Sequence, residues 1–130
     1  MNPDLEGKLF TKYPKIFDGT LVGKHIKCDD GWYKIIDVTC CRCQNHCDGH
    51  PEIPQIRAWK IREYFGMLCF GTIGGDKDIW EIIRRAESKS METCEKCGTK
   101  GDINFKGVWL KCLCSEHKNM ADEPADIELI

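Results

Sequence analysis

Apolar residues recur at steps of three and four along two stretches of the chain, which predicts two main helices. The first follows the turn Asp29-Asp30-Gly31, with Asp30 as the expected N-cap, and continues to about Cys47. The second covers residues 76–90 and begins with Asp76 or Asp78 as its cap. The buried stripe of the first helix is expected to consist of Trp32, Ile36, Cys40, Cys43 and Cys47. That of the second is expected to consist of Ile79, Trp80, Ile82, Ile83 and Ala86.

Shorter stretches with strand-like patterns predict a small antiparallel sheet. Residues 55–64 are expected to form one strand, in which Trp59 or Ile61 covers the helix layer, and residues 67–70 form the next. A short N-terminal helix is expected to end before Pro14. The predicted fold class is therefore α+β, with two main helices packed on a small antiparallel sheet.

Three cysteines and a histidine near the end of the chain have the spacing of a metal site. Cys94 and Cys97 form a C-x2-C pair followed by Gly98, and sixteen residues separate them from the C-x2-H pair Cys114 and His117. Each pair can place two ligands on one side of a tight turn, which suits tetrahedral Zn2+. Gly98 can adopt the positive φ that such a turn requires. The sequence predicts one structural Zn2+ ion with these four ligands.

The residues between the two pairs predict a short hairpin with Lys106-Gly107 near its turn, and hence a zinc ribbon or treble-clef-like module. Two alternatives remain open: an all-cysteine set in which Cys112 replaces His117, and buried cysteines that bind no metal. The expected organisation is an α+β body with an N-terminal arm over 1–93, a zinc module packed on it over 94–120, and an acidic tail over 121–130.

Composition and charge narrow the class of protein. The chain has 130 residues, 42% of them hydrophobic, which is enough for a core. No apolar stretch approaches a membrane span, and residues 1–6 do not resemble a signal peptide. With metal-type pairing among ten cysteines, a reduced cytoplasmic protein is expected. The formal net charge of −2 is not that of a general nucleic-acid binder.

A second group of cysteines and histidines lies in the first main helix. Cys43, His46, Cys47 and His50 are close enough in sequence to form a second metal site. Cys43 and Cys47 also lie on the apolar stripe, so packing in the core is the favoured alternative. His46 and His50, with Asp48, are also the one cluster suited to catalysis. Since the chain contains no nucleophile elbow, phosphate loop or H-E-x2-H motif, an enzyme is not the expected class.

Basic residues beside the aromatic residues Trp59 and Tyr64, together with lysines of the zinc module, are candidates for contacts with nucleic acid. The alternative is a solvated strand face whose cations protect the sheet edge. The candidate contacts are Arg57, Lys60, Arg62, Lys96, Lys100, Lys106 and Lys111.

Three motifs in a fixed order resemble a family of small, largely uncharacterised proteins from bacteria and their phages. They are Asp30-Gly31-Trp32-Tyr33, then residues 61–70, then Cys94-x2-Cys97-Gly98 with Leu113-Cys114-x2-His117. The corresponding family patterns are G-D-G-W, K-E-K-F-G-G-L-R-F, and C-x2-C-G with a closing L-C-x2-H. The resemblance covers about residues 28 to 117 and implies the same four metal ligands and a phage or prophage setting. Met67 and Cys69 depart from the second pattern, so no role of its arginine is carried over.

These observations lead to two expectations of function. The first is a non-enzymatic, zinc-stabilised interaction protein, encoded by a phage or prophage, that binds and modulates a host or defence-system protein complex. The alternative is a nucleic-acid-binding regulator that uses the zinc module and the adjacent basic strand.

Overall fold

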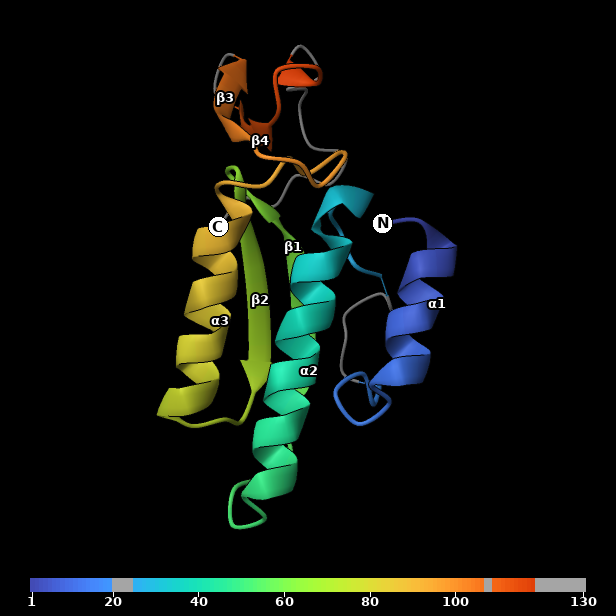
Figure 1. The fold of residues 1–130 in the computed structure, drawn as a ribbon. Coiled ribbons are helices and arrows are strands. Elements are labelled where there is room, and N and C mark those ends of the chain that lie inside the picture. Colours follow the sequence, from blue (N-terminus) through green and yellow to red (C-terminus); the bar gives the residue numbers. More distant parts are fainter. Residues whose placement is uncertain (20–24, 107–108, 119–130) are drawn as a thin grey trace.

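Two helices lie side by side across one face of a two-stranded sheet (Figure 1). A second hairpin lies at the end of the molecule where the first of these helices begins and the second ends (Figure 1). The computed structural model describes residues 1–19, 25–106 and 109–118. The elements are α1 (Pro3–Lys12), the 3-10 turn η2 (Asp30–Trp32), α2 (Tyr33–Gly49), β1 (Arg57–Tyr64), β2 (Met67–Ile73), α3 (Lys77–Ser90), β3 (Asp102–Lys106) and β4 (Trp109–Leu113). β1 pairs with β2 and β3 with β4, both antiparallel, so the predicted α+β class is confirmed.

Helix α2 supplies much of the core from one stripe. The predicted stripe is confirmed, since Trp32 and the four residues that follow it at helical spacing are all buried. The expected cap at Asp30 is wrong. The Asp30 carboxylate instead accepts a 2.7 Å hydrogen bond from the backbone N–H of Asn2, and the helix begins through η2 without a side-chain cap. Asp30 therefore ties the N-terminal helix α1 to the start of α2.

Strand β1 contains an irregularity that the alternating pattern does not reveal. Its register with β2 shifts between Ala58 and Lys60, so that Ala58 and Ile61 are both buried. Ile61 thus covers the helix layer as predicted, whereas Trp59 does not. The Trp59 side chain is 41% exposed and lies against Gly71 of β2.

Helix α3 begins as predicted at Asp76, whose carboxylate accepts hydrogen bonds from the backbone N–H groups of Asp78 and Ile79. Ile79, Ile83 and Ala86 are buried, but Trp80 is 55% exposed and its assignment to the stripe is wrong. Trp80 follows Ile79 directly, and the helical rotation of about 100° per residue turns it off the buried face.

Helix α1 packs beside α2, and Leu9 is fully buried. The Tyr13 hydroxyl donates a hydrogen bond to the Asp37 carboxylate of α2 at 2.6 Å. None of the described helices is long and apolar enough to cross a membrane. The predicted division into a body, a zinc module and a tail stays a prediction, and residues 119–130 lie outside the described part of the chain.

The β3–β4 hairpin and the loop before it contact the main body through the backbone of Gly31. The Gly31 N–H donates a 2.7 Å hydrogen bond to the carbonyl of Glu95. A Cβ atom at position 31 would overlap the carbonyl oxygens of Cys94 and Glu95. The Trp32 indole N–H also donates to the carbonyl of Thr93 at 2.9 Å. Glycine is therefore required where α2 meets this loop.

Replacing Gly31 with alanine is expected to lower the free energy of unfolding by about 3 kcal/mol, because the backbones must separate to admit the methyl group. Gly7→Ala is the matched control. A Cβ at Gly7 would meet nothing within 4 Å, and alanine in the exposed interior of α1 should raise stability by up to about 1 kcal/mol. Urea unfolding measures the change in the free energy of unfolding for both substitutions. Equal effects of the two substitutions would contradict the close contact at Gly31.

Candidate metal centre

The first ligand pair lies in a tight loop between α3 and β3. The Cys94 carbonyl accepts a hydrogen bond from the Gly98 N–H at 2.8 Å, and the Cys94 N–H donates to the Thr99 carbonyl at 2.7 Å. Gly98 has φ +81°, the left-handed conformation predicted for it. This loop turns Cys94 into the interior and leaves Cys97 exposed.

The second pair follows directly after β4. Cys114 comes one residue after the strand, and the His117 N–H donates to the Cys114 carbonyl at 3.1 Å, which closes a second tight turn. The β3–β4 hairpin reverses the chain between the two pairs and so brings them together.

The four predicted ligands form one group. The three sulfur atoms and one His nitrogen all lie within 4.8 Å of one another. Cys97 Sγ is 3.7 Å from Cys114 Sγ, and His117 Nδ1 is 3.6 Å from Cys94 Sγ and 3.1 Å from Cys114 Sγ. Metal bonds of zinc-like length in a tetrahedron would separate two sulfurs by about 3.8 Å, and a sulfur and a nitrogen by about 3.6 Å. The group therefore fits a structural metal ion.

The surroundings of Cys97 favour its thiolate. Hydrogen bonds from the side chain and backbone of Thr99 lower the pKa of Cys97 to about 7, and the Thr99 hydroxyl lies 3.1 Å from the sulfur. Because metals bind the thiolate form, this contact prepares the exposed ligand for coordination.

Cys112 belongs to the core and not to the metal group. It is fully buried, its thiol donates to the Met91 carbonyl at 3.1 Å, and burial raises its pKa to about 11. The four-residue group that the structure assembles contains His117 in its place. Their positions along the chain explain the difference, since Cys112 lies within β4 whereas Cys114 lies in the turn beyond it.

The structure does not bring Cys43, His46, Cys47 and His50 into one group. Cys43 and Cys47 are buried on the core stripe, and burial raises the pKa of Cys43 to about 12, which disfavours a metal-binding thiolate. The His46 side chain instead lies against the start of α3. Its Nε2 lies 2.9 Å from Asp76 Oδ2 and 3.9 Å from Asp78 Oδ2, at the start of α3.

The side chains of His46, Asp48 and His50 do not converge as a catalytic set either. His50 stacks on His46 with ring centroids 4.2 Å apart, and its Nδ1 faces the His46 carbonyl. The Asp48 carboxylate accepts from the Gln44 amide at 2.8 Å. His46, Asp76 and Asp78 are close enough to hold an ion, but no sequence signal links residues thirty positions apart.

Burial removes two of the candidate nucleic-acid contacts. Arg62 is only 6% exposed and donates to the Glu63 carbonyl, and Lys111 lies between two buried carboxylates. Neither can reach a phosphate without leaving these contacts, so both assignments are corrected. Arg62 follows Ile61 in the strand and so points to the other face of β1, where its backbone pairs with Lys27.

The other candidates are more accessible. Lys96 forms a 2.8 Å ion pair with Asp29, and Arg57 lies 3.8 Å from Asp18. The Lys60 ammonium lies 5.7 Å from the centre of the Trp59 ring, and Lys100 is exposed. The side chain of Lys106 lies outside the described part of the structure.

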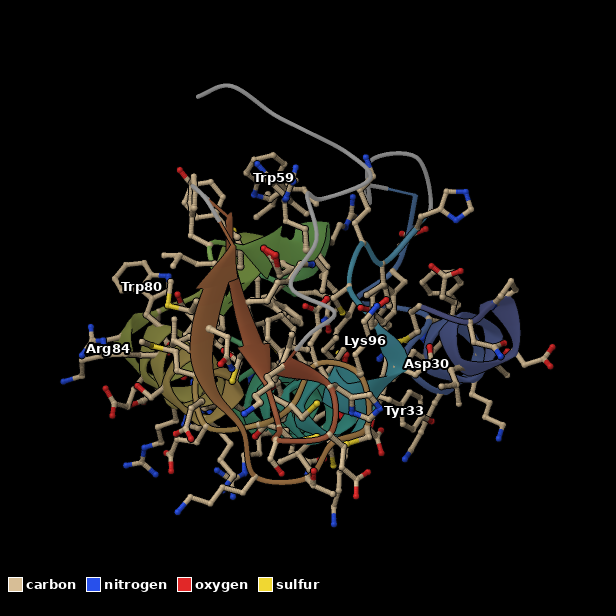
Figure 2. The ribbon with its side chains drawn as sticks, turned by 90° about the horizontal axis from the view of Figure 1, so that it is seen from above. Asp30, Tyr33, Trp59, Trp80, Arg84 and Lys96 are labelled. Carbon is tan, nitrogen blue, oxygen red and sulfur yellow. The ribbon has the colours of Figure 1, made fainter. Side chains whose placement is uncertain are left out.

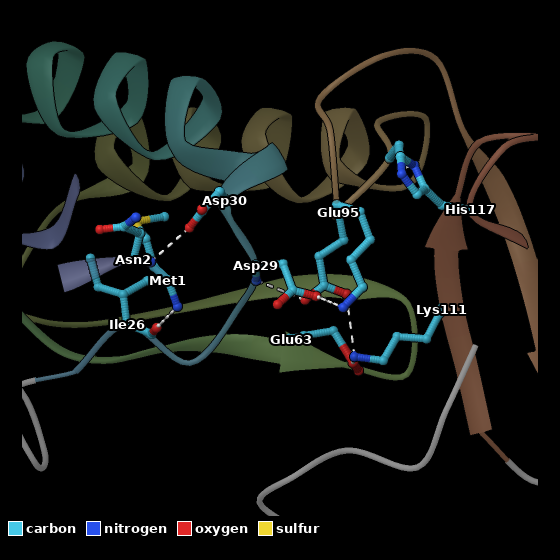
Figure 3. Close-up of polar contacts among 11 residues, drawn as sticks. Met1, Asn2, Ile26, Asp29, Asp30, Glu63, Glu95, Lys111 and His117 are labelled. Carbon is cyan, nitrogen blue, oxygen red and sulfur yellow. Dashed lines mark hydrogen bonds and ion pairs between the residues drawn. The ribbon is translucent and has the colours of Figure 1, made fainter. Parts of the chain in front are cut away.

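A buried charge network joins the metal loop to the main body (Figure 3). Lys111 Nζ of β4 lies 3.3 Å from Glu63 Oε2 of β1 and 3.3 Å from Glu95 Oε1, beside the ligand Cys94. Glu95 also accepts a 3.0 Å hydrogen bond from the backbone of Asp29. Burial raises the pKa of Glu95, and the nearby Lys111 opposes that rise. Burial alone would lower the pKa of Lys111, but the two carboxylates outweigh it and raise that pKa.

No family model, curated protein or solved structure matches this chain.

The metal group predicts which substitutions release the ion. Cys114→Ser and His117→Ala should reduce the metal content of the purified, reduced protein from one ion per chain to a small fraction and lower its melting temperature. Cys112→Ser is the matched control and should retain the metal, because its thiol bonds the Met91 carbonyl and lies outside the four-residue metal group. Elemental analysis measures the metal content of each variant, and thermal unfolding measures its melting temperature. Loss of metal in Cys112→Ser, with retention in His117→Ala, would favour the all-cysteine set.

The charge network predicts a pH-dependent effect of Lys111→Met. Without the cation, two buried carboxylates lose their partner, so stability at neutral pH should fall by about 3–5 kcal/mol. Burial already raises the pKa of Glu95, and Lys111→Met removes the cation that opposes this rise. The loss should therefore shrink as the pH falls from 8 towards 5 and Glu95 takes up a proton.

Urea unfolding at several pH values measures the difference between Lys111→Met and the wild type. Lys118→Met, which changes an exposed lysine, should have little effect at any pH. Adding Glu63→Gln and Glu95→Gln to Lys111→Met should recover much of the loss. A deficit independent of pH would contradict the network.

Proposed function

We propose that this protein is a non-enzymatic interaction protein whose C-terminal zinc ribbon or treble-clef-like module is held by one structural Zn2+. The observation that carries the proposal is the closed Cys3His group. Four protein ligands complete a tetrahedron and leave no position for a water molecule or a substrate, which is typical of structural and not catalytic zinc. Thiolate and imidazole ligands also suit Zn2+ better than hard cations such as Mg2+.

The zinc ion stabilises a small module on the end of a larger body. Among the described side chains of this module, Cys94, Leu113 and Cys114 form a small core cluster separate from the main core. Metal binding therefore contributes directly to the folding of this part of the chain.

Exposed tryptophans supply the surface for a protein partner. Figure 2 shows Trp59 of β1 and Trp80 of α3 pointing outward from the ribbon. Tryptophan is enriched among the residues that dominate binding energy at protein interfaces. The ten free cysteines support a reducing compartment such as the bacterial cytoplasm. A phage or prophage origin, and a host or defence-system complex as the partner, are proposed on the resemblance of the three sequence motifs.

Nucleic acid is the alternative partner. Lys60 over the Trp59 ring is a basic and aromatic pair on an exposed strand, which can stack on a base and contact a phosphate. The burial of Arg62 and Lys111 weakens this alternative, because it leaves fewer cations on that surface.

Affinity capture from a bacterial host lysate with the zinc-loaded protein tests the proposal. We expect the wild type to retain a specific host protein, and Trp59→Ala or Trp80→Ala to reduce its capture strongly. Lys8→Ala, an exposed change on α1, serves as the control and should leave capture unchanged. Capture of no host protein, together with tight DNA or RNA binding that falls steeply with salt, would replace the proposal with the alternative.

A further inference from the structure

A groove of about 730 Å³ runs along the surface between α2 and α3 and ends at the metal loop, where Cys97 and Gly98 line it. Its apolar lining includes Ile35 and Val38 of α2, and Ile82 of α3. Val38 is 40% exposed, although the opposite faces of both helices are buried in the core. The groove thus offers apolar surface to an occupant.

Cations stand on both sides of this apolar surface. Lys34 and Arg42 line the groove from α2, and Arg85 and Lys89 line it from α3. Arg85 forms an ion pair with Glu81, but Lys34, Arg42 and Lys89 pair with no carboxylate within the described part of the chain. The one acidic residue that lines the groove, Asp30, accepts a hydrogen bond from Asn2. The groove is therefore basic in a chain of net negative charge.

Residues 119–130 have the complementary composition. The segment contains Asp122, Glu123, Asp126 and Glu128 and no basic residue, with Ile127, Leu129 and Ile130 among them. The segment follows Lys118, immediately after the ligand His117, and so starts beside the metal-loop end of the groove. From Lys34 to Arg42 the groove follows α2 for about 12 Å. Twelve residues can span up to about 40 Å, which is ample.

We propose that the acidic segment 119–130 of this chain binds in the α2–α3 groove, with its aliphatic side chains on Ile35, Val38 and Ile82 and its carboxylates beside Lys34, Arg42 and Lys89. The segment covers apolar surface that the two helices leave exposed and neutralises cations that no described residue neutralises. This proposal concerns a different surface from the exposed tryptophans and does not depend on the proposed function.

Carbodiimide cross-linking of the intact, metal-loaded chain tests the proposal, because it joins a lysine to a carboxylate only where the two are in contact. At low salt and low protein concentration, we expect monomers in which Lys34 and Lys89 are joined to the acids of segment 119–130. These products, identified by mass spectrometry, should exceed several-fold those formed by the exposed Lys100 in the loop before β3. They should also decrease in concentrated salt.

The double substitution Ile127→Ser/Leu129→Ser keeps every charge and the length of the segment, and separates docking from simple proximity. It should lower the products of Lys34 and Lys89 several-fold and leave those of Lys100 unchanged. Arg42→Gln should also lower the products of Lys34 and Lys89, and it leaves every lysine in place. Circular dichroism checks that each variant is folded.

Two results would overturn the proposal. One is equal cross-linking of the segment to Lys34, Lys89, Lys100 and the distant Lys77, with no effect of Ile127→Ser/Leu129→Ser. The other is cross-linking to Lys34 and Lys89 only in covalent dimers, which would make a second copy of the chain the source of the bound segment.

Discussion

The placement of the β3–β4 hairpin on the main body depends on the close backbone contact between Gly31 and the loop that carries Cys94. Gly31 leaves room for the carbonyl oxygens of Cys94 and Glu95, and its N–H bonds the second of them. Its own carbonyl lies where a Cβ at Gly98 would approach within 3.1 Å. The start of the main core helix and the first ligand pair therefore share one surface, and a side chain at either glycine would separate them.

The same junction contains the buried charges. Removing Glu63, Glu95 and Lys111 from water is costly, and their mutual attraction offsets that cost only while all three stay in register. Each comes from a different segment, namely β1, the metal loop and β4. The network thus penalises any other placement of the hairpin on the body, whereas an apolar contact would tolerate sliding. The buried charges therefore hold the β3–β4 hairpin on the body beside the candidate metal group.

The cysteines divide into two chemical classes according to their surroundings. Cys40, Cys43 and Cys47 of α2 pack in the core with Ile36 and Trp32, where burial raises the pKa of the Cys40 and Cys43 thiols and keeps them protonated. Cys97 lies at the surface beside Thr99 and favours the thiolate. Buried cysteines such as Cys43 and Cys112 therefore serve packing, whereas Cys97 belongs to the candidate metal group.

The sequence by itself determined the helices, the two hairpin strands of each sheet and the four residues of the candidate metal group. These depend on local spacing, which the backbone geometry of helices, strands and tight turns converts directly into position. Only the tertiary structure decided that Asp30 bonds Asn2 instead of capping α2, that Arg62 is buried, and that His46 meets Asp76. It also decided that Lys111 is buried between carboxylates. Such contacts join residues far apart in the chain, and no local pattern of apolar and polar positions encodes which distant partner a polar side chain meets.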